Sequence, residues 1–229
     1  MAQLIDGNFE AVLFDLDGTL VDTAPDMVAV LQDLQRDHGI APVAYELGRA
    51  NVSNGALGLL RIAFPGVTDA ARDSLLVEYL ERYAPRVCQR SEIFAGLDEL
   101  LLKLEAAARP WGVVTNKPGH LTNPLIAQLA LNDRIACVVS GDTLPTRKPD
   151  PAPLHYACEI AGIAPENTLY IGDAARDIEA GSRAGMGTIA AAYGYITADD
   201  DPEWWGANEI AADTAELSRI ILKAVNLSV

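Results

Sequence analysis

Short runs of consecutive apolar residues recur along the chain, and each has the length of a buried β-strand. The five runs are "AVLF" (11–14), "WGVV" (111–114), "ACVV" (136–139), "TLYI" (168–171) and "GTIAAA" (187–192). Continuous apolar runs, without polar alternation, are typical of strands covered on both faces in a parallel sheet. The pattern therefore predicts five central strands.

The segments between these runs have helical periodicity. Four leucines between positions 97 and 104 follow the i, i+3, i+4, i+7 spacing of one helix face. The segment "DIEAGSRAG" (177–185) is typical of a short helix that ends at its final glycine. Strands that alternate with helices predict an α/β fold with a doubly wound, Rossmann-like parallel sheet.

One interval is too long for a simple crossover. Roughly 95 residues separate the first strand from the second, and a crossover needs far fewer. The interval has helical patterns: one helix is expected to begin after Asp22 or Thr23 and to end at Gly39. A second helix is expected over the apolar positions between Leu75 and Tyr83.

The chain is therefore expected to have two domains. Residues 1–23 and 91–229 form the α/β core, and residues 24–90 form an inserted α-helical lobe. The lobe leaves the core directly after "DLDGT" (15–19), so it should lie over the end of the first strand.

Composition narrows the class of protein. The chain has 229 residues, 50% hydrophobic and 21% charged, as in an ordinary globular protein. Its formal net charge of −15 argues against binding to nucleic acid or to an anionic membrane. The first ten residues lack the features of a secretory signal, and three scattered cysteines suggest neither a disulfide framework nor a metal site. A cytoplasmic protein is expected.

Carboxylates follow two of the predicted strands. Asp15 and Asp17 come directly after the first strand, and Asp173 follows the fourth, with Asp177 four residues further on. Ligands of open parallel sheets bind outside the carboxyl ends of the strands. Several hard oxygen ligands at one such edge suit Mg²⁺, whose positive charge would offset the repulsion between the carboxylates.

Neutral and cationic groups occupy matching positions. Thr115 and Asn116 follow the second strand, and Lys148 follows the third. A metal, a lysine and neutral donors around a carboxylate make a site for a dianion. Phosphoryl transfer needs such a site because its catalysis consists mostly of positioning and charge neutralisation.

Four motifs in this order resemble a known family. "DLDGTLVDT", "VVTNKP", "RKPDP" and "IGDAARD" are similar to the motifs of the haloacid dehalogenase superfamily of phosphohydrolases, and especially to those of phosphoglycolate phosphatases and their relatives. The insert after the first motif resembles the first type of cap domain in that superfamily.

The resemblance implies a role for each residue. Asp15 would be the nucleophile that forms an aspartyl-phosphate, and Asp17 would be the general acid and then the general base. Mg²⁺ would be held by the Asp15 carboxylate, the Asp17 backbone carbonyl and Asp173. Asp177 would orient metal-bound water.

The remaining motif residues would bind phosphate. Thr115 and Asn116 would contact phosphoryl oxygens, and Lys148 would neutralise charge between nucleophile and phosphate. In the cap, the segment 49–61 is expected to face this site, with Ser53 in a turn.

The sequence leaves the substrate open. A small phosphomonoester is expected, either of the phosphoglycolate type or a sugar phosphate such as N-acetylmuramic acid 6-phosphate, because "WGVVTNKP" and "YGYI" resemble phosphatases of that sugar. A β-phosphoglucomutase-like phosphotransferase and, in a different class, a receiver-like phospho-accepting signalling domain are the alternatives. Monomer and homodimer both remain open.

Overall fold

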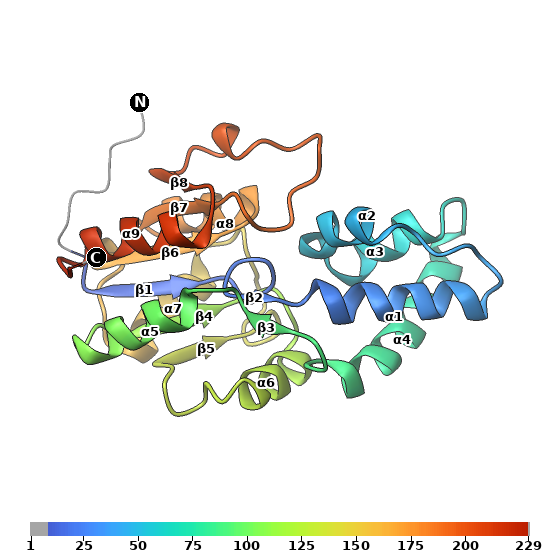
Figure 1. Cartoon of the computed structure of the whole chain (residues 1–229), viewed down its shortest axis with the longest axis horizontal. Coiled ribbons are helices and arrows are strands. Elements are labelled where there is room, and N and C mark those ends of the chain that lie inside the picture. Colours follow the sequence, from blue (N-terminus) through green and yellow to red (C-terminus); the bar gives the residue numbers. More distant parts are fainter. Residues whose placement is uncertain (1–8, 229) are drawn as a thin grey trace.

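A six-stranded parallel sheet forms the core of the protein (Figure 1). The computed structural model describes residues 9–228. Residues 1–8 and Val229 lie outside this range, so their assignment to the core and the prediction on a secretory signal fall outside the described residues. The strands are β1 (Ala11–Phe14), β4 (Trp111–Val114), β5 (Cys137–Val139), β6 (Thr168–Gly172), β7 (Gly187–Ala191) and β8 (Glu209–Ala211). Their spatial order is β5-β4-β1-β6-β7-β8. The predicted α/β fold is confirmed.

Helices cover both faces of the sheet. On one face lie α7 (Ala152–Ala161) and α8 (Ala175–Arg183); on the other lie α5 (Leu97–Ala106), α6 (Gly119–Gln128) and α9 (Thr214–Ala224). Alternate residues of β1 point to opposite faces, so Phe14 packs in the cluster with α5 and α9, and Leu13 packs in the cluster with α7. Burial on both faces explains why this strand is apolar throughout.

The direction of winding reverses at β1. This strand pairs with β4 on one side and with β6 on the other, so Phe14 is level with both Val113 and Ile171. Neighbouring connections diverge to opposite faces at such a point, and a crevice is left outside the carboxyl ends of the strands. The residues that follow β1, β4 and β6 meet there.

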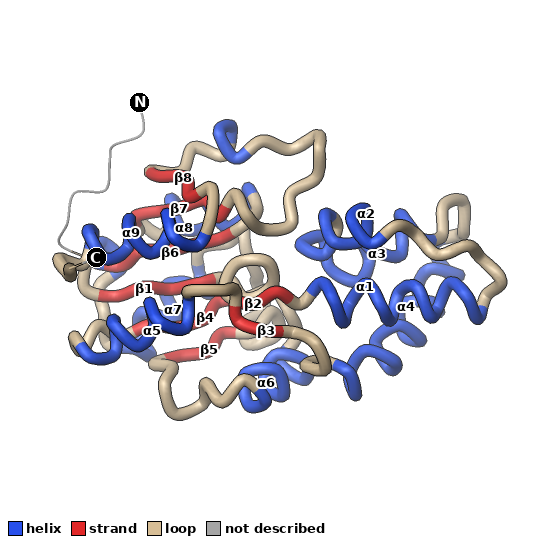
Figure 2. The backbone as a smooth tube through the Cα atoms, in the orientation of Figure 1, coloured by secondary structure: helices blue, strands red, loops and turns tan. Residues whose placement is uncertain are grey.

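The insert between the first two core strands is helical (Figure 2). It contains α1 (Ala24–Asp37), α2 (Tyr45–Ala50), α3 (Gly55–Ala63) and α4 (Asp69–Tyr83). The chain leaves the core at β2 (Val21–Asp22) and returns at β3 (Glu92–Ile93), and these two short strands pair antiparallel. The residue bounds 24–90 remain a prediction, and we call this helical segment the cap.

The cap has an interior of its own. Leu31, Leu59, Leu60 and Tyr79 are fully buried, and the Tyr79 hydroxyl donates a hydrogen bond to the Met27 carbonyl oxygen at 3.0 Å. These residues belong to α1, α3 and α4, so the helices of the cap pack on one another as well as on the core.

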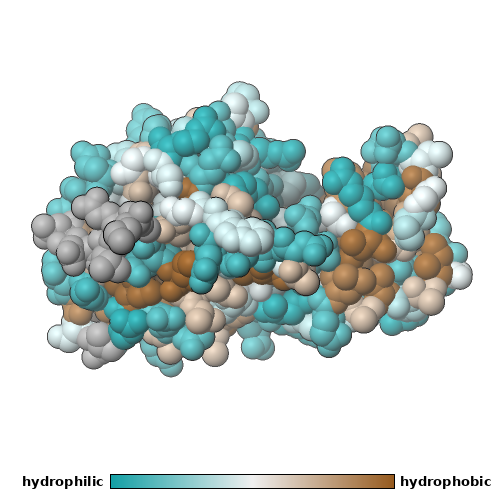
Figure 3. Space-filling model, turned by 90° about the horizontal axis from the view of Figure 1, so that it is seen from above, coloured by the Kyte–Doolittle hydropathy of each residue, from teal (hydrophilic) through white to brown (hydrophobic). Residues whose placement is uncertain are grey.

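Four single-turn 3₁₀ helices complete the secondary structure between residues 9 and 228: η1 (Val52–Asn54), η2 (Ala84–Arg86), η3 (Pro165–Asn167) and η4 (Pro202–Trp204). Figure 3 shows a mainly hydrophilic surface on one face, with apolar patches on the core and the cap. Among the described residues, none of the helices combines the length and apolar character needed to cross a bilayer.

Candidate active site

Three buried carboxylates converge at the carboxyl ends of β1 and β6. Asp15 follows β1 directly, and its N–H donates to the Ile171 carbonyl oxygen at 2.8 Å, which continues the pairing of the two strands by one residue. Asp173 follows β6, and Asp177 lies in the first turn of α8. One oxygen from each of the three lies within 4.8 Å of the others. Sheet register alone therefore brings residues that are 158 positions apart in the sequence to one point.

Lys148 supplies the positive charge at this point. Its side chain is almost fully buried, and Nζ lies 2.9 Å from Oδ1 of Asp15 and 2.8 Å from Oδ1 of Asp177. Nζ also donates to the Val114 carbonyl oxygen and to the Tyr170 hydroxyl. One lysine thus pairs with two of the three carboxylates.

Asp173 is the carboxylate of the three that forms no ion pair with the described residues. Burial, together with the charges of Asp15 and Asp177, raises the pKa of Asp173 to about 8. Its Oδ2 accepts hydrogen bonds from Ser53 Oγ and from the Tyr195 N–H, whereas Oδ1 is buried and has no hydrogen-bond partner among the described residues. A buried, unpartnered carboxylate oxygen beside two further carboxylates fits a hard divalent cation.

Asp17 has a lysine of its own. Lys117 Nζ lies 2.8 Å from Oδ1 of Asp17 and donates to the Tyr83 hydroxyl at 3.1 Å. Burial lowers the pKa of Lys117, but the charge of Asp17 and the contact with Tyr83 outweigh it, so the pKa lies above its usual value. Thr23 Oγ1 donates to the same Asp17 oxygen at 2.5 Å.

Thr115 and Asn116 lie beside the Lys148 loop. The Asn116 side chain accepts from the Lys148 N–H at 3.1 Å and donates to the Lys148 carbonyl oxygen at 3.0 Å, so it holds that loop in place. Thr115 is buried, and its Oγ1 accepts from the Lys117 N–H. The side chain of Asn116 is thus occupied within the protein.

The cap reaches the site through its first 3₁₀ turn. Ser53 Oγ donates to Oδ2 of Asp173 at 2.6 Å, and Arg176 of the core donates to the Ser53 carbonyl oxygen at 2.8 Å. Arg49 donates to the carbonyl oxygens of Tyr193 and Gly194, both at 3.2 Å. The segment 49–61 therefore contacts the core at Ser53, as expected, and Arg49 binds core backbone.

Three contributors were not identified as site residues from the sequence. Lys117 stands in the motif "VVTNKP", two residues after Thr115, and this position was the available signal. Tyr195 gives its N–H to Asp173, and its hydroxyl accepts from the N–H groups of Thr23 and Ala24 at the start of α1. Arg176 lies within "IGDAARD".

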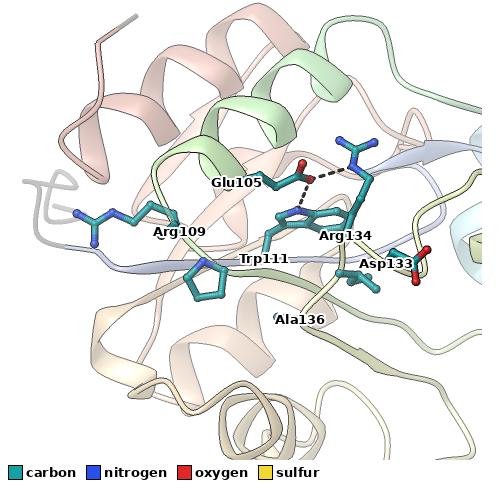
Figure 4. Close-up of a pocket in the computed structure, with 9 residues that line it drawn as sticks. Glu105, Arg109, Trp111, Asp133, Arg134 and Ala136 are labelled. Atoms are coloured by element: carbon teal, nitrogen blue, oxygen red, sulfur yellow. Dashed lines mark hydrogen bonds and ion pairs between the residues drawn. The ribbon is translucent and has the colours of Figure 1, made fainter.

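A separate pocket lies at the other end of the sheet (Figure 4). It is lined by the start of β4 and the residues before β5, and Glu105 accepts hydrogen bonds there from Trp111 and Arg134. It faces the amino ends of these strands, so it is remote from the aspartates.

Comparison with known proteins identifies the family. A family model described as "Haloacid dehalogenase-like hydrolase" matches residues 12–191, which include all four motifs. The chain belongs to the haloacid dehalogenase-like hydrolases. The resemblance seen in the sequence is therefore confirmed.

Two similar relatives of this haloacid dehalogenase-like hydrolase are phosphatases. The chain is 41% identical over 216 residues to an N-acetylmuramic acid 6-phosphate phosphatase of Pseudomonas putida, which covers 94% of this chain and 97% of the relative. It is also 41% identical over 207 residues to a phosphoglycolate phosphatase of Xanthomonas campestris, with 90% and 94% covered. The protein is a phosphatase, and the receiver-like alternative is set aside by the family match.

A solved structure has the same architecture. The crystal structure of a predicted phosphoglycolate phosphatase from Haemophilus somnus superposes with a TM-score of 0.81 at 27% identity, over 93% of this chain and 98% of that one. Both core and cap are included at this coverage, so the helical insert is shared with that structure.

Proposed function

We propose that this phosphatase is a Mg²⁺-dependent phosphomonoesterase of small phosphorylated metabolites that works through an aspartyl-phosphate on Asp15. The observation that carries the proposal is the pairing of Asp15 with Lys148 beside the unpartnered Oδ1 of Asp173. A nucleophile paired with a fixed cation, beside an uncompensated acceptor, forms a site for a phosphoryl dianion and a metal ion.

In the first step, Asp15 attacks phosphorus as the bond from phosphorus to the leaving oxygen breaks. Lys148 and the Leu16 N–H both bind Oδ1 of Asp15, and no described residue donates a hydrogen bond to Oδ2. Asp17 gives its proton to the leaving oxygen, so the product leaves as a neutral alcohol.

In the second step, Asp17 accepts a proton from a water molecule that attacks phosphorus. The bond between phosphorus and Asp15 breaks, which restores the carboxylate and releases inorganic phosphate. Thr115 and the backbone of Asn116 bind phosphoryl oxygens throughout both steps.

Asp15, Asp173 and the backbone carbonyl of Asp17 are the groups proposed to hold Mg²⁺, with Asp177 and Lys148 beside them. When bound, the ion offsets the repulsion between phosphate and carboxylates. Asp177 keeps the site in shape, since Oδ2 accepts the Ala174 N–H at 3.1 Å and Oδ1 pairs with Lys148.

Two substrates are supported by the relatives at equal identity: N-acetylmuramic acid 6-phosphate and phosphoglycolate. Both are phosphomonoesters that also carry a carboxylate. We propose a substrate of this shared chemistry, and the cap contacts at Ser53 and Arg49 support a selecting role for the cap.

A panel of phosphomonoesters tests the proposal. Release of inorganic phosphate is measured with and without Mg²⁺ for both compounds, glucose 6-phosphate and p-nitrophenyl phosphate. At least one carboxylated substrate should exceed glucose 6-phosphate in kcat/KM, and EDTA should abolish turnover. Isomerisation of β-glucose 1-phosphate without phosphate release would support the phosphotransferase instead, and inactivity on the whole panel would overturn the proposal.

A further inference from the structure

The two catalytic aspartates share one arrangement of donors. In Asp15, Lys148 and a backbone N–H bind Oδ1; in Asp17, Lys117 and the Thr23 hydroxyl bind Oδ1. In each case, no hydrogen bond reaches Oδ2 from residues 9–228. Each carboxylate thus has one oxygen fixed by a lysine and a second oxygen free to react.

Lys117 is buried and paired. Its side chain is 5% exposed, and Nζ has two polar partners, Asp17 and Tyr83. The Nζ also lies 4.9 Å from the centre of the Tyr83 ring, within the range of a cation–π contact. A buried lysine is costly unless it is paired, so this one is held in a single position by both partners.

Its two partners come from different domains. Asp17 follows β1 in the core, whereas Tyr83 is the last residue of α4 in the cap and is itself buried. Tyr83 also stacks on Tyr79, at 6.0 Å between ring centres, and Tyr79 anchors α1 through the Met27 carbonyl. The lysine thus connects the acid–base residue to the packed interior of the cap.

Thr23 makes the second connection. It occupies the position before α1, where a threonine ordinarily caps the helix with its own side chain. Here its hydroxyl binds Asp17, and the Tyr195 hydroxyl takes over the first N–H groups of the helix. Both donors to Asp17 therefore depend on where the cap helices α1 and α4 lie.

We propose that Lys117 is a positioning residue that, with Tyr83, fixes Oδ1 of Asp17 so that Oδ2 carries the transferred proton while the cap is seated on the core. The inference rests on the proposed function. As the bond from phosphorus to the leaving oxygen breaks, the proton on Oδ2 moves to that oxygen, and Lys117 and Thr23 stabilise the carboxylate that is left. Lys117 binds neither phosphate nor metal in this role.

The experiment compares leaving groups. An alkyl phosphate needs a proton on its leaving oxygen, whereas p-nitrophenolate departs without one. The quantity to measure is kcat/KM for the best alkyl substrate and for p-nitrophenyl phosphate, because this constant covers only steps up to cleavage of the ester and excludes the shared hydrolysis of the phosphoenzyme.

Lys117→Met should lower kcat/KM for the alkyl substrate by about 10²-fold, at the lower end of what general acid catalysis supplies. For p-nitrophenyl phosphate the loss should be at least tenfold smaller. Lys117→Arg, which keeps a donor, should recover part of the alkyl rate. Lys103→Met removes an exposed lysine of α5 and should leave both constants unchanged.

Tyr83→Phe keeps the lysine and removes only the hydroxyl, so it tests the link to the cap even if Lys117→Met does not fold. It should lower kcat/KM for the alkyl substrate by roughly fivefold, which corresponds to the loss of about one hydrogen bond. It should leave kcat/KM for p-nitrophenyl phosphate unchanged. Equal losses on both substrates, or no loss on either, would overturn the role of Lys117 while the phosphatase function stands. A wild-type protein inert towards both substrates would overturn the two proposals together.

Discussion

Ser53 of the cap donates a hydrogen bond of 2.6 Å from Oγ to Oδ2 of Asp173 in the core. The two residues are 120 positions apart, and Asp173 is a proposed ligand of the metal. A residue of the cap thus touches a proposed metal ligand of the core. This contact links the seating of the cap to the state of the carboxylate cluster.

Ser53→Ala should weaken this seating. Hydrogen bonds to charged groups are typically worth ~1.5–3 kcal/mol, and water replaces part of that, so KM should rise by roughly tenfold while kcat changes little. Steady-state kinetics with a saturating Mg²⁺ concentration check the prediction. Ser74→Ala is the control, because the hydroxyl of that exposed cap serine donates to the Ala70 carbonyl of its own helix. An unchanged KM in Ser53→Ala would contradict the link.

The raised pKa of Asp173 predicts how stability of the metal-free protein depends on pH. Its pKa is about 8 in the folded protein against an ordinary value of 3.8, so the folded state holds a proton between these values that the unfolded state has lost. The free energy of unfolding must therefore fall as pH rises through this window. In EDTA, Tm should decline from pH 5 towards pH 8, by roughly 2–4 °C for each kcal/mol lost.

Mg²⁺ should oppose this decline, because a bound cation replaces the proton. The increase in Tm on adding Mg²⁺ should therefore grow across the same pH range. Asp173→Asn removes the titrating group and should flatten this part of the profile in EDTA. Parallel profiles for wild type and Asp173→Asn would show that the dependence comes from elsewhere.

Gly18 is a second test of the metal site. It has φ of +82°, and a Cβ there would lie 2.1 Å from Oδ2 of Asp173. Gly185 has a similar φ of +78° with nothing within 4 Å, so Gly185→Ala carries the backbone strain alone. Gly185→Ala should lose about 1–2 kcal/mol of stability, and Gly18→Ala should lose more because it adds the steric clash. Only Gly18→Ala should also lose Mg²⁺ affinity, by at least roughly tenfold, as titration of Tm or of activity with Mg²⁺ would measure.

The two aspartates should fail at different steps. Asp15→Asn should form no acid-labile phosphoenzyme. Asp17→Asn should lose about 10²–10⁴-fold in kcat yet still accumulate phosphoenzyme from p-nitrophenyl phosphate, since that leaving group needs no acid. Quenching in acid and detecting protein-bound phosphate distinguishes them. Asp133→Asn, which changes an exposed aspartate, should behave as wild type, and phosphoenzyme in Asp15→Asn would remove the nucleophile assignment.

The core strands were predictable because burial on both faces leaves an unbroken apolar run, as in "AVLF". β8 was missed because it has three residues at the sheet edge and begins with the half-buried Glu209. Thr23 was expected as a possible helix cap on local grounds, but its hydroxyl binds Asp17, and a tyrosine 172 positions away caps the helix. The sequence shows which residues are able to cap a helix, but it does not show which hydrogen-bond partner lies nearest to their side chains in the fold.

The motif residues were located from the sequence because strand ends place them at one edge. Lys117 and Ser53 were not assigned to the catalytic machinery, since their partners, Tyr83 and Asp173, belong to the other domain in each case. Local patterns carry no information on how two domains face each other. The contacts across that boundary therefore had to come from the structure.

The pairing of β2 with β3 has a consequence for how such enzymes diversify. Val21 lies opposite Ile93, so β2, where the chain leaves the core, and β3, where it returns, run side by side. A segment inserted between these two strands therefore need not disturb β1, the strand that Asp15 follows. The nucleophile and the selecting lobe can therefore vary separately. A different helical lobe, inserted between the same two strands, would leave the strand before Asp15 unaltered but would have to supply a new partner for Lys117.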